Sequence, residues 1–340
     1  MSNYFQDKKV VIAGGCSFIA SHTIEKLLTL GVKEIIAVDD LSSGAISNLP
    51  KDKRVSLQIG NLRNYDVAKD RIKGDVCLDF SSIHGGRGFV GTNHEVAISD
   101  NFVLNTNVLR AAVANGVQRI AFSSSACAYD VRRQMDETQE FRIPESWDNH
   151  DASLFPDGMY GLSKAVHERV LRAYQKDGLI ETSICRFFTV FGPRMKENHF
   201  ICATIAKAFA RTDPFYVWGS PDVIRNFTPV QNTRDGFLLA AATGNGEIYN
   251  IGLEDRITIG YAVARIFELM DWFPNDLIYQ PDKPVGIRNR VADCTKAKTE
   301  LGWQPTVTFE QGLADTIDWY ISTHKQDDVR RDLEKLLVSR

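Results

Sequence analysis

Tyr160 and Lys164 stand four residues apart in the segment YGLSK, and their side chains suggest a specific chemistry. The surrounding sequence predicts a helix from about 159 to 177, which places both residues on one helical face. An ammonium group beside a phenol stabilises the phenolate, so we expect Lys164 to lower the pKa of Tyr160. The pair therefore predicts a base that accepts a proton from a hydroxyl group.

A second candidate lies before this helix, in the segment SSACAY that begins at Ser124. Cys127 follows Ser125 by two residues, just after the apolar run RIAFS, which predicts a buried strand. A buried cysteine is usually a small core residue. A thiol that its neighbours tune toward neutrality can instead transfer protons. Both interpretations of Cys127 stay open at this point.

The segment AGGCSFIASH joins a predicted strand to a predicted helix near the N-terminus. In a dinucleotide-binding fold, backbone N–H groups at such a turn face a pyrophosphate. The pattern has glycine at three positions, held here by Gly14, Ser17 and Ala20, so two of the three are replaced. Asp39 ends the second strand at the spacing expected for a ribose contact. Because Asp39 and Asp40 would repel a ribose phosphate, we expect NAD rather than NADP.

Short apolar runs alternate with helical patterns along the first half of the chain, which predicts a parallel sheet covered on both faces. The expected strands are 8–15, 34–40, 55–62, 75–82, 119–125 and 182–191, with a helix near 101–115. After Gly192 the alternation gives way to mixed pieces and a helix near 259–270. The fold class is therefore α/β: a Rossmann-type doubly wound parallel sheet with a smaller mixed α/β substrate-binding lobe.

This pattern also predicts the domain organisation. We expect a dinucleotide-binding domain over 1–192 that carries Ser125, Tyr160 and Lys164. A mainly substrate-binding lobe follows over 193–326, from which some strands and helices return to the first domain. Residues 327–340 form a charged C-terminal helix.

The glycine turn, SSACAY, YGLSK, RFFTVFGPR and KAKTELGWQP together resemble the extended short-chain dehydrogenase/reductase family that modifies nucleotide sugars. The resemblance covers nearly the whole chain and implies that Ser125 binds a sugar hydroxyl, Tyr160 is the base and Lys164 holds the nicotinamide ribose. With a cysteine at position 127, two residues after the serine, the sequence resembles the GDP-mannose 3,5-epimerases and the GDP-fucose synthases within this family. In that comparison His199 becomes the second proton-transfer residue, although as an alternative it caps the helix that follows.

The same resemblance implies the ligand contacts. The cofactor-binding residues are expected to be Gly14, Ser17, Phe18, Ile19, Asp39, Asp40, Asn61, Leu62, Phe80, Ser81, Ser82, Tyr160 and Lys164. The substrate-binding residues are expected to be Gly86, Arg87, Ser125, Thr189, Arg225 and Arg288, with the arginines at positions 225 and 288 on the diphosphate. Four residues differ from the usual types: Asn61 replaces an aspartate, Thr189 replaces an asparagine, Arg87 stands where methionine is usual, and His84 is also unusual. His84 is interpreted as a loop histidine.

Composition limits the partners. The chain has 340 residues, with 40 Lys and Arg, 43 Asp and Glu, and a formal net charge of -3, which gives no bulk attraction to nucleic acid or to an anionic membrane. The six cysteines lack the spacing of zinc sites or disulfide frameworks. No apolar run approaches a membrane span or a signal peptide. We expect a cytoplasmic homodimer that binds NAD and a nucleotide-diphosphate sugar, a GDP-sugar in preference, and no metal.

Several functions fit these residues. The preferred hypothesis is an epimerase that forms a transient 4-keto sugar while Cys127 and His199 invert C3, C5 or both. A nucleotide-sugar 4-epimerase would need only Ser125, Tyr160 and Lys164. A C4 dehydrogenase or reductase and an epimerase-reductase are further alternatives. A non-catalytic NAD-binding protein would explain the altered glycine turn.

Overall fold

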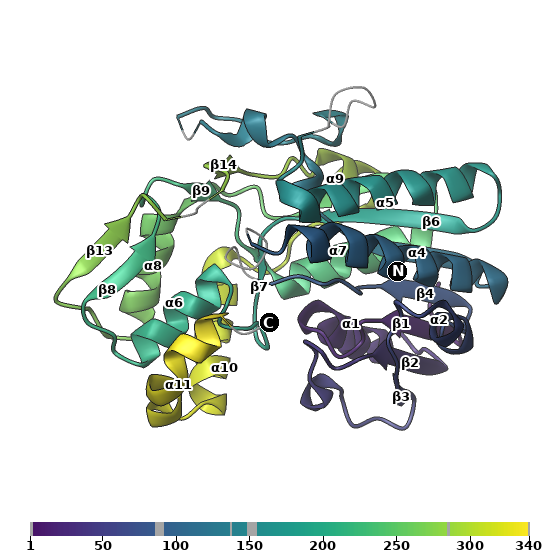
Figure 1. Ribbon diagram of the computed structural model, residues 1–340, viewed down its shortest axis with the longest axis horizontal. Helices are drawn as coiled ribbons and strands as arrows, with labels where there is room; N and C mark the ends of the chain where they lie inside the picture. The colour runs from purple at the N-terminus through teal and green to yellow at the C-terminus, as the bar shows by residue number, and fades with distance from the viewer. Residues whose placement is uncertain (1–2, 86–91, 137, 148–154, 284–285, 339–340) are drawn as a thin grey trace.

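The structure is a computed structural model that describes residues 3–85, 92–136, 138–147, 155–283 and 286–338. Its larger part is a sheet between two layers of helices, and a smaller lobe of helices and short strands lies at one end of it (Figure 1). This is the Rossmann-type α/β fold that the sequence predicts.

The main sheet has seven parallel strands in the order β11-β6-β5-β4-β1-β2-β3. Their bounds are β1 Lys9–Ala13, β2 Glu34–Asp39, β3 Val55–Ile59, β4 Val76–Asp79, β5 Arg119–Ser125, β6 Glu181–Phe187 and β11 Ile248–Ile251. The central strands are buried on both faces, which explains why their sequences are continuous apolar runs. The chain order reverses between β1 and β4, the place where this fold binds dinucleotides.

Helices cover both faces of this sheet (Figure 1). One layer holds α2 Tyr65–Arg71, α4 Asn101–Ala114 and α5 Gly158–Lys176, and the other holds α1 Phe18–Thr29, α7 Val230–Thr243 and α9 Thr295–Leu301. Alternate residues of β1 point to different layers: Val11 joins one buried cluster, whereas Val10 and Ile12 join the other. The helices predicted at 101–115 and 159–177 are confirmed within a residue or two.

The smaller lobe has a hydrophobic core of its own. Its helices are α6 Phe200–Phe209, α8 Ile259–Leu269, α10 Phe309–Thr323 and α11 Gln326–Val338. Its strand pairs and short sheet are β8 Phe215–Trp218 with β13 Leu277–Gln280; β7 Val190–Phe191 with β10 Thr228–Pro229; and β9 Ile224–Arg225 between β12 Ile257–Thr258 and β14 Asn289–Arg290. Single-turn or short helical segments lie at Ile46–Asn48, Val96–Asp100, Ala126–Ala128, Val131–Gln134 and Glu145–Trp147.

The structure corrects one predicted strand. The run 182–191 is two strands, β6 and β7, because the chain turns between them at Thr189, whose φ is 40°. A β-branched residue rarely adopts a positive φ, so nothing in the apolar pattern indicates this break. The short strand β7 leaves the main sheet and pairs with β10 instead.

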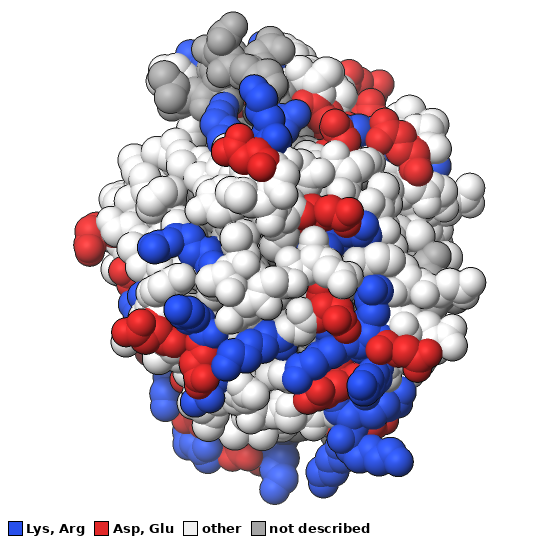
Figure 2. Space-filling model, turned by 90° about the vertical axis from the view of Figure 1, so that its right-hand side faces the viewer, with Lys and Arg blue, Asp and Glu red and all other residues white. Residues whose placement is uncertain are grey.

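Basic and acidic side chains lie beside one another on the face shown in Figure 2, and uncharged side chains occupy much of the rest. This mixing is expected of a chain with 40 basic and 43 acidic residues. Over the described ranges, none of the helices is both long and apolar enough to cross a membrane.

Gly161 allows α5 to approach the turn 126–128 closely. A Cβ atom at this position would overlap the carbonyl oxygen of Cys127. We therefore expect Gly161→Ala to destabilise the protein by about 1–3 kcal/mol, since overpacking forces the backbone to shift. Urea unfolding of the two proteins measures this difference, and equal stabilities would show that the approach is not tight.

Candidate active site

Tyr160 lies in the first turn of α5, beside the carboxyl ends of β4 and β5. Its side chain is buried and packs with Ala97 and Cys127. Ser82, after β4, and Ser125, at the end of β5, both hydrogen-bond the phenol. The structure thus brings together Ser82, Ser125 and Tyr160, three of the residues predicted to contact the sugar or the cofactor.

The prediction that Lys164 lowers the pKa of Tyr160 is wrong. The pKa of Tyr160 is raised, because burial penalises the phenolate and the nearby Cys127 adds to the effect, while the hydrogen bonds with Ser82 and Ser125 oppose it. The Lys164 Nζ atom lies 5.7 Å from the centroid of the tyrosine ring. It donates instead to the Ser123 carbonyl oxygen at 2.9 Å.

Lys164 is itself almost completely buried. Burial lowers its pKa to about 8, against the charges of Asp79, Glu168 and Cys127, which favour the ammonium form. Asp79, at the end of β4, accepts hydrogen bonds from the backbone N–H and the hydroxyl of Ser81 at 2.9 and 2.5 Å. Asn105 donates to the other Asp79 oxygen at 3.1 Å. A connected polar network therefore holds the buried Asp79 carboxylate, whose charge favours the ammonium form of Lys164.

The glycine turn has the geometry of a phosphate cradle. Gly14 has a φ of 71°, and a Cβ atom there would lie 3.0 Å from the backbone of Ser81. Ser17 precedes α1 without capping it through its side chain, so the first-turn amides at Phe18 and Ile19 have no side-chain cap. This arrangement fits the pyrophosphate of a dinucleotide at the helix N-terminus.

Asp39 supports the same interpretation. Its carboxylate accepts the backbone N–H of Cys16 at 2.9 Å and that of Leu41 at 2.8 Å. Burial raises its pKa, and these two hydrogen bonds oppose the shift. A carboxylate has further lone pairs for ribose hydroxyls. The neighbouring Asp40 accepts only the N–H of Ser42 at 3.0 Å among the contacts of the described residues.

The other predicted cofactor contacts flank this cradle. The Asn61 side chain accepts hydrogen bonds from the backbone and the guanidinium of Arg63 at 3.0 and 3.2 Å, so it is engaged within its own loop. Leu62 and Phe80 are buried, and the ring of Phe80 packs on Phe237 at a centroid distance of 4.6 Å.

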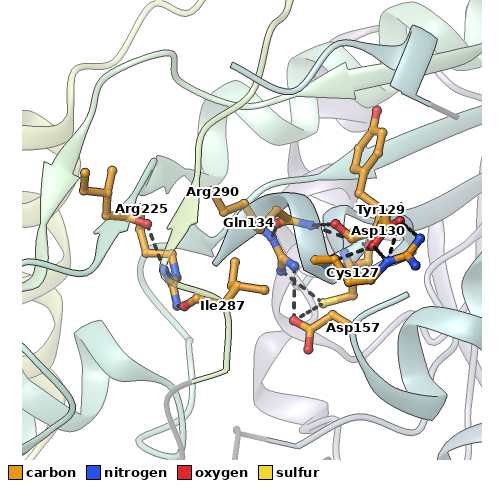
Figure 3. Close-up of polar contacts among 11 residues, drawn as sticks. Cys127, Tyr129, Asp130, Gln134, Asp157, Arg225, Ile287 and Arg290 are labelled. Atoms are coloured by element: carbon orange, nitrogen blue, oxygen red, sulfur yellow. Dashed lines mark hydrogen bonds and ion pairs between the residues drawn. The ribbon is translucent and has the colours of Figure 1, made fainter. Parts of the chain in front are cut away.

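Cys127 contacts a buried ion pair that the sequence did not indicate (Figure 3). The Nη1 atom of Arg290 lies 3.3 Å from the cysteine Sγ, and its Nη2 atom lies 3.1 Å from Oδ2 of Asp157. Gln134 fixes the guanidinium by accepting from its Nε at 2.7 Å. Cys127 is also the only cysteine of the described residues that is not buried. The cysteine Sγ also lies 3.9 Å from the same Asp157 oxygen, so the sulfur lies between a guanidinium and a carboxylate.

His199 is the N-cap residue of α6 by position, as the alternative predicts, but its side chain makes no capping hydrogen bond to the helix. Its ring stacks on His84 at a centroid distance of 5.4 Å and an interplanar angle of 9°. His84 in turn contacts the ring of Tyr160 at 4.5 Å. The loop histidine therefore lies inside the candidate site.

The predicted substrate contacts are less closely gathered. Arg225 donates to the carbonyl oxygens of Ile224 and Ile287 at 2.8 and 2.7 Å, apart from the Cys127 cluster in Figure 3. Arg288 is exposed, and its backbone N–H donates to Gln134 at 2.8 Å. The Thr189 carbonyl accepts the N–H of Thr228 at 3.0 Å. Gly86 and Arg87 lie outside the described residues.

Arg290, Asp157 and Gln134 are the residues that sequence reasoning missed. Arg290 is two residues after the predicted Arg288, and no local pattern separates a buried arginine from an exposed one. Asp157 stands where a helix cap is expected, yet its side chain makes no capping hydrogen bond and turns to Arg290 instead. That missing cap becomes visible only in the structure.

Comparison with known families identifies the family of this chain. The model of the NAD dependent epimerase/dehydratase family matches residues 10–252. The chain belongs to this family, and NAD is its cofactor.

The chain is also similar to individual epimerases and to solved structures. GDP-mannose 3,5-epimerase 1 of Oryza sativa subsp. japonica is 30% identical over 321 residues, covering 92% of this chain and 81% of the relative. GDP-mannose 3,5-epimerase of Arabidopsis thaliana is 27% identical, with 92% and 82% covered. The UDP-glucose 4-epimerase of Thermotoga maritima, solved with UDP-glucose, has the same fold, with a TM-score of 0.83, 23% identity and coverage of 93% and 99%.

The Arg290 contact predicts the reactivity of Cys127. In Arg290→Gln the sulfur loses the guanidinium that contacts it while the Asp157 carboxylate stays beside it, so we expect alkylation of Cys127 by iodoacetamide at neutral pH to slow several-fold. Mass spectrometry of the modified peptide gives the rate. Cys127→Ser is the control that assigns the labelled site, since the other five cysteines are buried. An unchanged rate would show that the guanidinium does not activate the thiol.

Proposed function

We propose that this protein is a redox-neutral nucleotide-sugar epimerase that acts through a transient ketone at C4 of the sugar and inverts C3, C5 or both. The observation that carries the proposal is Cys127, which packs against Tyr160 while the buried Arg290–Asp157 pair holds its sulfur. A cysteine that served only as packing would not need a guanidinium donor in a buried site.

The residues divide the chemistry between them. Tyr160 accepts the proton of the C4 hydroxyl in its phenolate form, which burial disfavours and the hydrogen bonds with Ser82 and Ser125 favour. Ser125 also orients that hydroxyl. When bound, NAD supplies a reversible hydride acceptor. The Lys164 ammonium, fixed on the Ser123 carbonyl, is placed to hold the ribose hydroxyls.

A ketone at C4 makes the hydrogens on C3 and C5 acidic, which allows inversion by two residues. His199 as a neutral imidazole removes a proton from one face, and the Cys127 thiol delivers one to the opposite face. The result is an imidazolium and a thiolate, and Arg290 stabilises the thiolate. Inversion of the second carbon runs in the opposite direction, with the thiolate as base and the imidazolium as acid, and restores the starting protonation.

The substrate we propose is a nucleotide-diphosphate sugar, with GDP as the preferred nucleotide. The 30% identity with the rice GDP-mannose 3,5-epimerase supports this preference. Arg225 and Arg288 lie on neighbouring segments, since the N–H of Ile224 donates to the Arg288 carbonyl at 2.8 Å. Two guanidinium groups from adjacent segments suit a diphosphate.

The alternative is a 4-epimerase, which the shared fold with the Thermotoga maritima enzyme allows. That reaction needs Ser125, Tyr160 and Lys164, and gives Cys127 and His199 no role. Exchange of carbon-bound hydrogen with solvent separates the two functions.

Incubation with a panel of GDP- and UDP-sugars in deuterated water tests the proposal. We expect deuterium at C3 or C5 with the wild-type protein, and an at least about 100-fold slower incorporation in Cys127→Ser and His199→Asn, because each lacks one proton carrier. Proton NMR locates the deuterium.

Two controls accompany this experiment. Both variants should still oxidise C4, whereas Tyr160→Phe should lose oxidation and exchange together. A wild-type enzyme that turns over a sugar without any carbon-bound deuterium would establish the 4-epimerase instead.

We further propose a homodimer formed through α4 and α5. Phe102 and Val103 on α4 and Met159 on α5 expose 39%, 44% and 39% of their surface, and the two helices pack side by side. Paired helices of this kind from two copies form a four-helix bundle.

The dimer predicts the effect of a charge at this surface. Val103→Asp would bury an unpaired carboxylate between the copies, so we expect the protein to become monomeric. Light scattering after size-exclusion chromatography measures the mass. Phe273→Asp, at a residue that is 62% exposed in the lobe, is the matched control and should leave the dimer intact. A wild-type protein with the mass of one chain would refute the proposal.

A further inference from the structure

His84 lies in the candidate site, but the proposed mechanism assigns no role to it. It lies in the loop after β4, and its ring contacts two others: the centroid of the Tyr160 ring lies 4.5 Å away and that of the His199 ring 5.4 Å away. The histidine rings are nearly parallel, at 9°, whereas the ring of Tyr160 is tilted by 55°. His84 therefore contacts both Tyr160, beside the main sheet, and His199, which immediately precedes α6 of the smaller lobe.

The stack determines how His199 can present its imidazole. Its side chain makes no capping hydrogen bond to α6, so the helix that follows does not fix the plane of the ring. The nearly parallel ring of His84 covers one face of it instead. Stacking of this kind restricts rotation of the imidazole and excludes water from that face.

The electrostatics of the stack disfavour a charge on either ring. Burial lowers the pKa of His199 to about 4, and the ammonium of Lys196 adds to the effect. Burial also lowers the pKa of His84 to about 3, with contributions from His199 and Lys164. Within the described part of the chain, Tyr160 is the other titratable group that contacts the stack. Both imidazoles are thus neutral at neutral pH, and a proton on one opposes a proton on the other.

We propose that His84 is a positioning residue for His199: its ring covers one face of the His199 imidazole, holds the ring in plane and keeps it dry, so that His199 enters the reaction as a neutral base. The inference rests on the proposed function, in which His199 and Cys127 exchange protons with the sugar. In that exchange His199 gains the proton that leaves carbon, and Cys127 loses the proton that carbon receives, so one imidazolium and one thiolate form together.

The test compares variants that lack an aromatic ring at position 84, called open variants, with proteins that have one. His84→Ser and His84→Gln remove the aromatic cover, and His84→Phe keeps an aromatic ring at the same place. In the holoenzyme labelled with ¹³C-histidine, NMR titration follows the His199 imidazole, which the spectrum of His199→Asn assigns. We expect its titration midpoint to stay near 4 in the wild type and in His84→Phe, and to rise toward the ordinary value of 6.5 in His84→Ser and His84→Gln.

The rate of solvent exchange provides the second measurement. The acid limb of the pH profile for deuterium incorporation should move upward with the titration in the two open variants, and His84→Phe should keep the profile of the wild type. A titration midpoint of His199 that is the same in all four proteins would overturn the proposal, as would a midpoint in His84→Phe that rises as far as in His84→Ser.

The two measurements also distinguish a failure of the inference from a failure of the proposed function. The titration requires no sugar substrate, so it reports on the His84–His199 stack even if no sugar exchanges hydrogen. Absence of carbon-bound deuterium in the wild type, with the expected change in titration, would refute the epimerase and leave the stack as a structural finding. Deuterium incorporation with an unchanged titration would refute the role of His84 alone.

Discussion

The site depends on the close approach of α5 to the turn that follows β5. The N–H of Asp157 donates to the carbonyl of Cys127 at 2.8 Å, and Gly161 leaves room for that carbonyl to lie against the helix. This contact joins the two segments that carry Ser125, Cys127, Tyr160 and Lys164. A larger residue at position 161 would separate Cys127 from Tyr160. The glycine between the tyrosine and the lysine is therefore part of the site's geometry.

A second buried network holds β5 and β6 under this contact. Glu168 on α5 accepts Nε and Nη2 of Arg186 at 2.9 and 2.5 Å, and the hydroxyl of Ser124 donates to the same carboxylate. The Arg186 guanidinium also lies 4.3 Å from the ring centroid of Tyr129. Buried ion pairs cost desolvation, and they are tolerated where several hydrogen bonds satisfy both ions. This network connects the helix that carries Lys164 to the strand that ends at Ser125.

Much of the fold followed from the sequence because its signals are local. Apolar runs, the glycine turn at Gly14 and the carboxylate at Asp39 each indicate an element and its place in a parallel sheet. Contacts between distant segments do not leave such signals. Arg290 meets Cys127 across 163 positions of the chain, and His84 meets His199 across the gap between a sheet loop and a lobe helix. The pKa of Tyr160 was misjudged for the same reason, since burial depends on the packed structure rather than on the spacing of Tyr160 and Lys164.

The path of the chain between the two parts limits how the molecule can be divided or bent. After β7 the chain forms α6 in the lobe, returns as α7 and β11 to the main sheet, goes back to the lobe as α8, and returns again as α9. If the chain stopped at Gly192, the sheet would lose its edge strand β11 and the helices α7 and α9 from one face. Phe80 and Phe187, whose rings pack on Phe237 of α7, would then be exposed. Several crossing segments also resist a wide opening about one hinge. The two parts are therefore expected to fold and unfold as one cooperative unit.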